Sequence, residues 1–217
     1  MTDSTIVSLS QLDQCKKSEA VDLFVDSFRN VLTFTQSKLE LVKLISASFC
    51  NSSIYVYLAD NQVVGILGIG TNTQRALHFD KHLCQTIFGG IKGRIIYGML
   101  HRIAEIPAVK NDTDLYIDYL ATDSRMRNRG IATKLLNFAG ELPLFKECYI
   151  EVLSKNATAI KLYENLGFSV HKRSFNFFTF TQGLGHPIMM KKLMKHKELE
   201  VCSVEPIGRK AKVSLVI

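Results

Sequence analysis

The stretch from Leu115 to Phe168 constrains the fold of this 217-residue chain most strongly. It reads as an apolar strand, LYIDYLATD, a basic turn, SRMRNRGIA, a helix, TKLLNFAGEL, a second strand, CYIEVL, and a second helix, NATAIKLYENLGF. Strands that alternate with helices in this way are typical of an α/β sheet with crossover helices. We therefore expect the rest of the chain to extend a sheet around this unit.

Composition excludes several classes of protein. An apolar share of 47% against 22% charged residues is not that of a disordered chain, and the length suits one domain. No apolar run is long enough for a membrane span, and the N-terminus lacks the features of a signal peptide, so we expect a cytoplasmic protein without a membrane partner. The 5 cysteines are odd in number and form no CxxC pair, and we expect neither a disulfide framework nor a metal site.

The net charge of +7 is unevenly distributed. The last part of the chain, from Lys191 to Ile217, holds seven basic and three acidic residues, a surplus of four. We therefore expect a single domain over residues 1–194 and a basic C-terminal extension over residues 195–217.

Apolar periodicity predicts the elements that flank the central unit. They are an edge strand over 5–10, helices over Lys16–Val31 and Ser37–Phe49, a hairpin of 53–59 and 62–70, a helical insertion over about 73–111, a long strand over 169–181 and a closing strand over 188–193. This order predicts an α/β (α+β) fold, in which helices flank a mixed central sheet of about six to seven strands. The insertion separates the third and fourth strands.

The basic turn has the composition of an anion site. If a helix begins near Arg129 or Gly130, the N–H groups of its first turn lack intrahelical partners and lie at the positive end of the helix dipole. Arg127 and Lys134 add charge, and the small residues Gly130 and Ala132 let a phosphate approach the backbone. Taken alone, the turn is equally consistent with a solvated basic loop.

The second helix favours the ligand-binding interpretation. Asn156, Ala159, Tyr163 and Leu166 recur at spacings of three and four and therefore share a face. Each has an ordinary structural role available, such as a helix cap for Asn156 or a packed aromatic for Tyr163. Those roles do not explain why this helix follows the basic turn by one crossover unit.

Together the two motifs resemble a known family. Arg127-x-x-Gly130-x-Ala132 after LYIDYLATD is similar to the acetyl-CoA signature, (Gln or Arg)-x-x-Gly-x-(Gly or Ala), of the GNAT superfamily of N-acetyltransferases. The run from Asn156 to Phe168 resembles the second motif of that family, Asn-x-x-Ala-x-x-x-Tyr-x-x-x-Gly-Phe. The departures are Ser124, Asn128 and Ala132, where many members carry Pro, Gly and Gly, and they bear on cofactor affinity more than on the fold.

The resemblance implies acetyl-CoA as co-substrate, no metal, and a role for each matching residue. The residues implied to contact acetyl-CoA are Leu120, Ala121 and Thr122 along the pantetheine arm, Arg127, Asn128, Arg129, Gly130, Ile131, Ala132 and Thr133 around the pyrophosphate, and Asn156. Tyr163 would be the general acid, because a phenol with a pKa of about 10 can protonate a departing thiolate.

An amine acceptor must lose a proton before it attacks, so a general base is also expected. Asp118 is the first candidate, because strict alternation along its strand places it in phase with Leu120, and Glu151 on the neighbouring strand is the second. Either carboxylate could instead serve only in an ion pair.

The function implied by the resemblance is transfer of an acetyl group to a primary amine of a small molecule or peptide, by direct attack in a ternary complex. A homodimer is compatible with it, and no nucleic-acid partner is expected. Two alternatives are a non-catalytic acyl-CoA sensor and a nucleic-acid-binding module. The second rests on the net charge and on KRSFNFFTF, which has the basic-aromatic character of an RNA-binding strand.

Overall fold

The computed structural model describes residues 4–176, 179–180 and 183–194. Within these residues one mixed sheet has the strand order β1-β2-β3-β4-β5-β7-β6, and only the β4–β5 pair is parallel. The strands are β1 (Ser4–Ser8), β2 (Ile54–Ala59), β3 (Gln62–Gly70), β4 (Asp114–Thr122), β5 (Glu147–Leu153), β6 (Ser169–Arg173) and β7 (Pro187–Leu193). The expected mixed sheet flanked by helices is confirmed.

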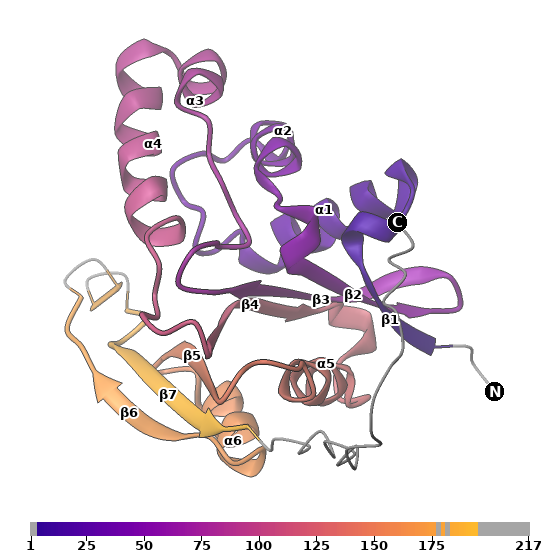
Figure 1. Cartoon of the computed structure of the whole chain (residues 1–217). Coiled ribbons are helices and arrows are strands. Elements are labelled where there is room, and N and C mark those ends of the chain that lie inside the picture. The colour runs from indigo at the N-terminus through magenta and orange to yellow at the C-terminus, as the bar shows by residue number, and fades with distance from the viewer. Residues whose placement is uncertain (1–3, 177–178, 181–182, 195–217) are drawn as a thin grey trace, which may run out of the picture.

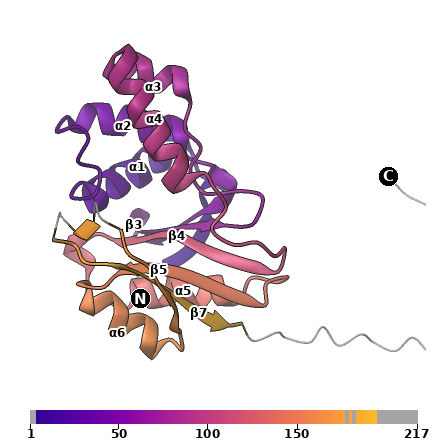
Figure 2. The ribbon, with the colours of Figure 1, turned by 90° about the vertical axis from the view of Figure 1, so that its left-hand side faces the viewer.

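Helices cover both faces of this sheet (Figures 1 and 2). They are α1 (Gln14–Phe28), α2 (Lys38–Ser48), α3 (Lys81–Phe88) and α4 (Gly90–Ala104) on one face, and α5 (Ile131–Gly140) and α6 (Ala157–Asn165) on the other. Each face has its own apolar cluster, one centred on α1 and α2 and the other on α5 and α6. Among the described residues, no helix combines the length and apolarity that a membrane span requires.

Local signals explain where the first elements begin. The Asp13 carboxylate accepts the N–H of Lys16 at 2.8 Å and starts α1, and the Ser37 hydroxyl accepts the N–H of Glu40 at 3.3 Å and starts α2. The hairpin predicted from the adjacent β-rich runs is confirmed, and its turn is Asp60-Asn61, with φ of 48° and 58°.

The insertion between β3 and β4 contains two helices, α3 and α4, where the periodicity predicted one. They separate at Gly89, whose φ of 87° is incompatible with a continuous helix. The apolar stripe that indicated the helix does not face the core, because Ile91, Ile95 and Ile103 are exposed. The buried side of α4 is Gly93, Ile96 and Leu100.

The prediction of one long strand over residues 169–181 is wrong. β6 ends at Arg173, and Thr179 and Phe180 are in a helical conformation, with the N–H of Thr179 donating to the Asn176 side chain. The closing strand β7 lies between β5 and β6 and so separates the two strands that α6 connects. The extension predicted over 195–217 and residues 177, 178, 181 and 182 lie outside the described part of the chain.

Candidate functional site

An opening between β4 and β5 marks the centre of the site. The two strands pair only from Asp114 to Ile117 and from Glu147 to Ile150, although β4 continues to Thr122 and β5 to Leu153. Beyond Ile117 the backbone groups on the facing edges have no partner in the sheet. An extended ligand with amide groups can satisfy them there, as an added strand would. Leu120, Ala121 and Thr122 line this edge of β4, where the sequence predicted the pantetheine arm.

The basic turn closes one end of the opening. α5 begins at Ile131, one or two residues later than predicted, and Gly130 precedes it with a φ of 74°. Asn128 also has a positive φ, 61°, a conformation that Asn tolerates better than most residues. A Cβ atom built on Gly130 would meet nothing within 4 Å, so the space beside the first turn is open. The free N–H groups of Ile131, Ala132 and Thr133 are therefore accessible to an anion.

The cations of the turn differ in their contacts. Lys134 donates to the Tyr57 hydroxyl at 2.9 Å, so this charge is directed away from the turn. Arg125 makes two hydrogen bonds to the Asp123 carboxylate, at 2.7 and 3.1 Å. Arg127 and Arg129 have no ion pair among the described residues. They are the cations of this loop that remain available to a phosphate.

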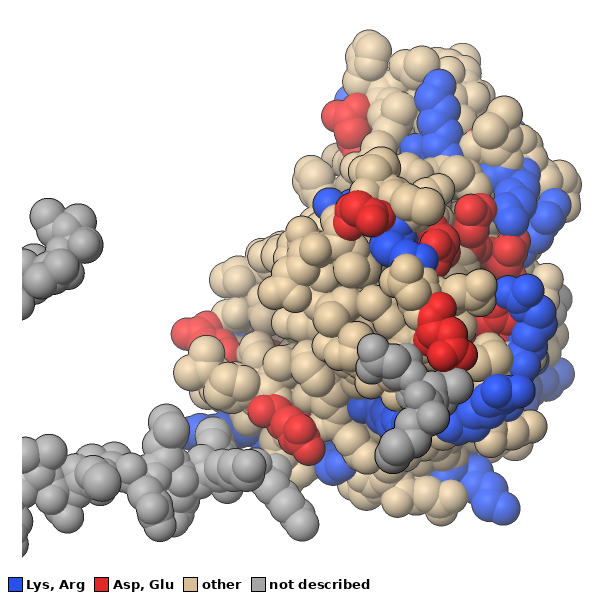
Figure 3. All heavy atoms as spheres, turned by 90° about the vertical axis from the view of Figure 1, so that its right-hand side faces the viewer, with Lys and Arg blue, Asp and Glu red and all other residues tan. Residues whose placement is uncertain are grey.

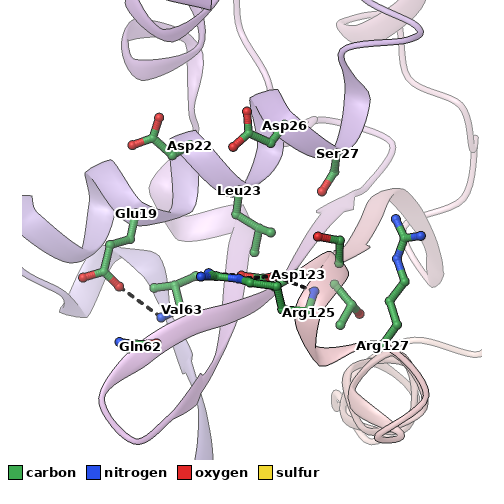
Figure 4. Close-up of a pocket in the computed structure, with 12 residues that line it drawn as sticks. Glu19, Asp22, Leu23, Asp26, Ser27, Gln62, Val63, Asp123, Arg125 and Arg127 are labelled. Atoms are coloured by element: carbon green, nitrogen blue, oxygen red, sulfur yellow. Dashed lines mark hydrogen bonds and ion pairs between the residues drawn. The ribbon is translucent and has the colours of Figure 1, made fainter.

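A cavity of about 600 Å³ lies between α1 and the loop that follows β4 (Figure 4). Thr122 and Arg127, two predicted cofactor residues, line it, and Leu23 points into it from α1. Asp22 and Asp26 lie on its rim and point away from Arg125. Both carboxylates bind Lys38, at 3.6 and 2.8 Å, and this single lysine compensates one of their two negative charges.

Helix α6 brings a phenol to the face of the sheet that carries α5. The Asn156 side chain caps the helix by accepting the N–H of Ala159 at 3.2 Å. Tyr163 is buried in the apolar cluster of α5 and α6, and burial raises the pKa of its hydroxyl to about 12. Such a phenol keeps its proton at neutral pH and can donate it.

Asp118 lies on the opposite face, because a β-bulge interrupts the alternation of β4. Gly68 pairs with Tyr119 but Ile69 pairs with Ile117, so Asp118 is an extra residue in the strand. Tyr119 packs into the cluster of α1 and α2, whereas Leu120 packs into that of α5 and α6. The expectation that Asp118 is in phase with Leu120 is therefore wrong.

The Asp118 carboxylate is also fully engaged. One oxygen accepts Arg75 Nε at 2.5 Å and the other accepts the N–H of Ala76 at 2.6 Å. Burial raises the pKa of Asp118, and the charge of Arg75 and the N–H of Ala76 oppose that shift. A base that must take a proton from a substrate needs a free oxygen, and this carboxylate has none directed at the opening.

Glu151 meets that requirement better. Cys148, Ile150 and Val152 pack toward α5 and α6, so Glu151 projects from the other face of β5, just beyond the last paired residue. It is solvent-accessible, and yet burial raises the pKa of its carboxyl, with the charge of Arg75 opposing the shift.

Two residues of this face were missed in the sequence. Arg75 stands in the polar loop after β3, and Tyr116 belongs to β4, where its ring lies 5.0 Å from the Arg75 guanidinium carbon. Tyr116 is buried beside Tyr149 and Val109. The alternation of LYIDY could have placed Tyr116 on the face opposite Leu115, but nothing local links Arg75 to β4.

Comparisons with known proteins show the family and the fold. The profile of the Acetyltransferase (GNAT) family matches residues 18–168. The chain belongs to the GNAT family. N-alpha-acetyltransferase 30 of Xenopus laevis is 41% identical to this GNAT chain over 66 residues, which are 29% of the chain and 24% of that protein. The chain thus spans about a quarter of the curated relative.

Solved structures share the GNAT fold. An N-acetyltransferase from Staphylococcus aureus Mu50 superposes with a TM-score of 0.59 at 18% identity, over 86% of this chain and 99% of that one. The NatC complex bound to Gag peptide and CoA gives 0.53 at 16% identity, over 89% and 99%. Membership of the family identifies the chain as an acetyltransferase. The roles of the individual site residues, Tyr163 and Asn156 included, stay predictions.

Charge on the surface bears on the alternative of a nucleic-acid-binding module. On the face shown in Figure 3, acidic and basic side chains lie next to one another. The run KRSFNFFTF, which suggested an RNA-binding strand, does not form one strand, because β6 ends at Arg173. The described residues of this run that follow Arg173 therefore present no strand surface to RNA.

Proposed function

We propose that this acetyltransferase acetylates the α-amino group at the N-terminus of a peptide or protein, by direct attack in a ternary complex. The observation that carries the proposal is the opening between β4 and β5, with the phenol of Tyr163 on one face and the carboxylate of Glu151 on the other. The donor would enter from the face of α5 and α6, and the amine from the face of α1–α4.

The chemistry follows from these positions. Glu151 would accept a proton from the amine as its nitrogen attacks the thioester carbonyl carbon, and Tyr163 would give its proton to the thiolate as the C–S bond breaks. The free N–H groups at the start of α5, with Arg127 and Arg129, would hold the pyrophosphate. Asp118, held by Arg75 and Ala76, would support the acceptor side without taking the proton.

The nature of the base supports an α-amine as acceptor. With a pKa of about 7.8, about a third of peptide α-amines are neutral at pH 7.5, against about one in a thousand lysine side chains with a pKa of about 10.4. A single carboxylate with a raised pKa can complete the deprotonation of a peptide α-amine. It is poorly matched to a lysine side chain, which is almost always protonated at this pH. The 41% identity to N-alpha-acetyltransferase 30 within the matched residues supports the same class.

The test is an acceptor panel assayed by release of the CoA thiol. We expect turnover with peptides that have a free N-terminus, and none with Nα-blocked lysine peptides, polyamines or aminoglycosides; mass spectrometry locates the acetyl group. Turnover restricted to the small amines would refute the α-amine proposal. If no acceptor releases thiol although acetyl-CoA binds, the chain is a sensor and the catalytic proposal fails.

The base has its own test. Glu151→Gln should lower kcat/KM by about 100-fold or more, the usual contribution of a general base, while calorimetry shows unchanged acetyl-CoA binding. The matched control is Glu164→Gln, the same substitution at an exposed glutamate of α6, and it should leave activity unchanged. Equal activity of the two variants would remove Glu151 from the mechanism.

A further inference from the structure

Arg75 connects the helical insertion to the strand that borders the opening. Its Nε lies 2.5 Å from one oxygen of Asp118, and the N–H of the next residue, Ala76, lies 2.6 Å from the other. The ion pair is almost inaccessible, with side-chain exposures of 8% for Arg75 and 5% for Asp118. Consecutive residues of the insertion therefore fix both oxygens of the carboxylate at the β4 bulge.

The same guanidinium reaches two other parts of the site. Its Nη1 donates to the carbonyl oxygen of Ile106, at the far end of the insertion, so Arg75 ties the two connections of the helical hairpin together. Its carbon lies 5.0 Å from the centre of the Tyr116 ring, within the range of a cation–π contact. One side chain thus holds the insertion, the bulge and the ring of Tyr116.

Strand β3 leaves room for this arrangement. A Cβ atom on Gly70 would lie 3.0 Å from Cδ of Arg75 and 3.2 Å from Oδ1 of Asp118, closer than ordinary van der Waals contact. Gly70 therefore ends β3 without a side chain where the ion pair packs against it. The pair is enclosed by backbone on one side and by Tyr116 on the other.

We propose that Arg75 is a positioning residue for acetyl transfer, which fixes the bulge and Tyr116 at the acceptor side and supplies a positive charge on the face that carries Glu151. This inference rests on the proposed function, in which Glu151 is the base. Among the described residues, the charged and titratable groups on this face include Arg75 from the insertion and Tyr116 and Asp118 from β4. Tyr149 on β5 belongs to the same face, with Glu147, Lys191 and His171 around it. Asp118 is the counterion that orients Arg75.

The sign of the expected effect follows from the charge. Burial raises the pKa of Glu151 and Arg75 lowers it, so loss of the guanidinium should raise that pKa further. A general base acts in its deprotonated form, and activity is lost as the pH falls through its pKa. Without Arg75 the acid limb of kcat/KM should therefore move to higher pH, by about one unit for a neighbouring charge.

The experiment compares four variants of the full chain by the pH profile of kcat/KM on an acceptor peptide and by thermal unfolding. Arg75→Gln should shift the acid limb upward by about one unit and lower kcat/KM about tenfold below the limb. Arg75→Lys keeps the charge and should hold the limb near its wild-type position. Arg94→Gln, an exposed cation of α4, is the control and should change neither property.

The double variant Arg75→Gln/Asp118→Asn separates positioning from stability. It removes the unpaired buried carboxylate that Arg75→Gln leaves, so its thermal stability should recover, while the shifted acid limb should remain. Recovery of both the stability and the wild-type profile would overturn the inference, as would an unshifted limb in Arg75→Gln. If the Glu151→Gln variant kept the acid limb of the wild-type protein, the proposed base would be refuted instead.

Discussion

Replacing Gly93 with alanine should destabilise the protein, whereas the same change at Gly98 in the same helix should stabilise it. A Cβ atom at Gly93 would lie 2.3 Å from the carbonyl oxygen of Cys84 and 2.5 Å from Cα of Gln85. Both are backbone atoms of α3, which a rotamer change cannot move. A Cβ atom at Gly98 would meet nothing within 4 Å.

The magnitudes follow from these contacts. Alanine gains about 1 kcal/mol over glycine inside a helix, and nothing opposes that gain at Gly98. At Gly93 overpacking costs about 1–3 kcal/mol, and contact with rigid backbone places the cost at the upper end, so the free energy of unfolding should fall by about 2 kcal/mol. The two variants should thus differ by about 3 kcal/mol, or about 6–12 °C in Tm for a chain of this size.

Urea unfolding followed by circular dichroism measures both changes, with a shared slope m as the check that the transition is the same. The wild type should lie between the two variants. A Gly93→Ala protein as stable as the Gly98→Ala protein would show that α3 and α4 do not pack at this glycine, and would refute the reasoning.

Three further predictions concern the site and the core. Gly130→Glu should abolish acetyl-CoA binding in calorimetry, because the new negative charge repels phosphate. The chain should stay folded, because the space beside Gly130 is open. The control Gly130→Ala should cost only about 1–2 kcal/mol of backbone strain and should retain binding. Tyr163→Phe should lower kcat about 100-fold at unchanged acetyl-CoA affinity, and activity that stays at the wild-type level would exclude the phenol as acid. Burial raises the pKa of the Cys148 thiol to about 12. At pH 8 a maleimide should therefore label the exposed Cys15 and leave Cys148 unlabelled until urea unfolds the chain. Equal labelling of the two cysteines in native samples, measured by mass spectrometry, would contradict the burial of Cys148.

The local elements were predictable because short-range signals set them. The turn Asp60-Asn61, the cap Ser37 before α2 and the basic turn before α5 each act within a few residues. The long strand predicted from SVHKRSFNFFTFT was wrong, because an alternation of aromatic and polar residues does not show which of them have a partner strand. β7 pairs with β6 only from Ser169 to Arg173.

The stripe of isoleucines on α4 shows the same limit. Its period correctly indicated a helix, but periodicity does not say which face meets the protein. Gly93 admits α3 on the other side of the helix, so Ile91 and Ile95 remain exposed. Packing of the neighbouring helix, absent from the local pattern, decided the orientation.

By itself the sequence determined the local geometry on which the predicted donor site depends, because the turn from Arg127 to Ala132 and the helix after Asn156 are continuous motifs. The proposed acceptor side depends on the tertiary structure. The bulge at Asp118 reverses the face of every residue after it, and Arg75 reaches that carboxylate across 43 positions of sequence. Neither a register shift nor a long-range ion pair leaves a periodic signal, so Arg75 was missed in the sequence and Glu151 ranked only second to Asp118 as the candidate base.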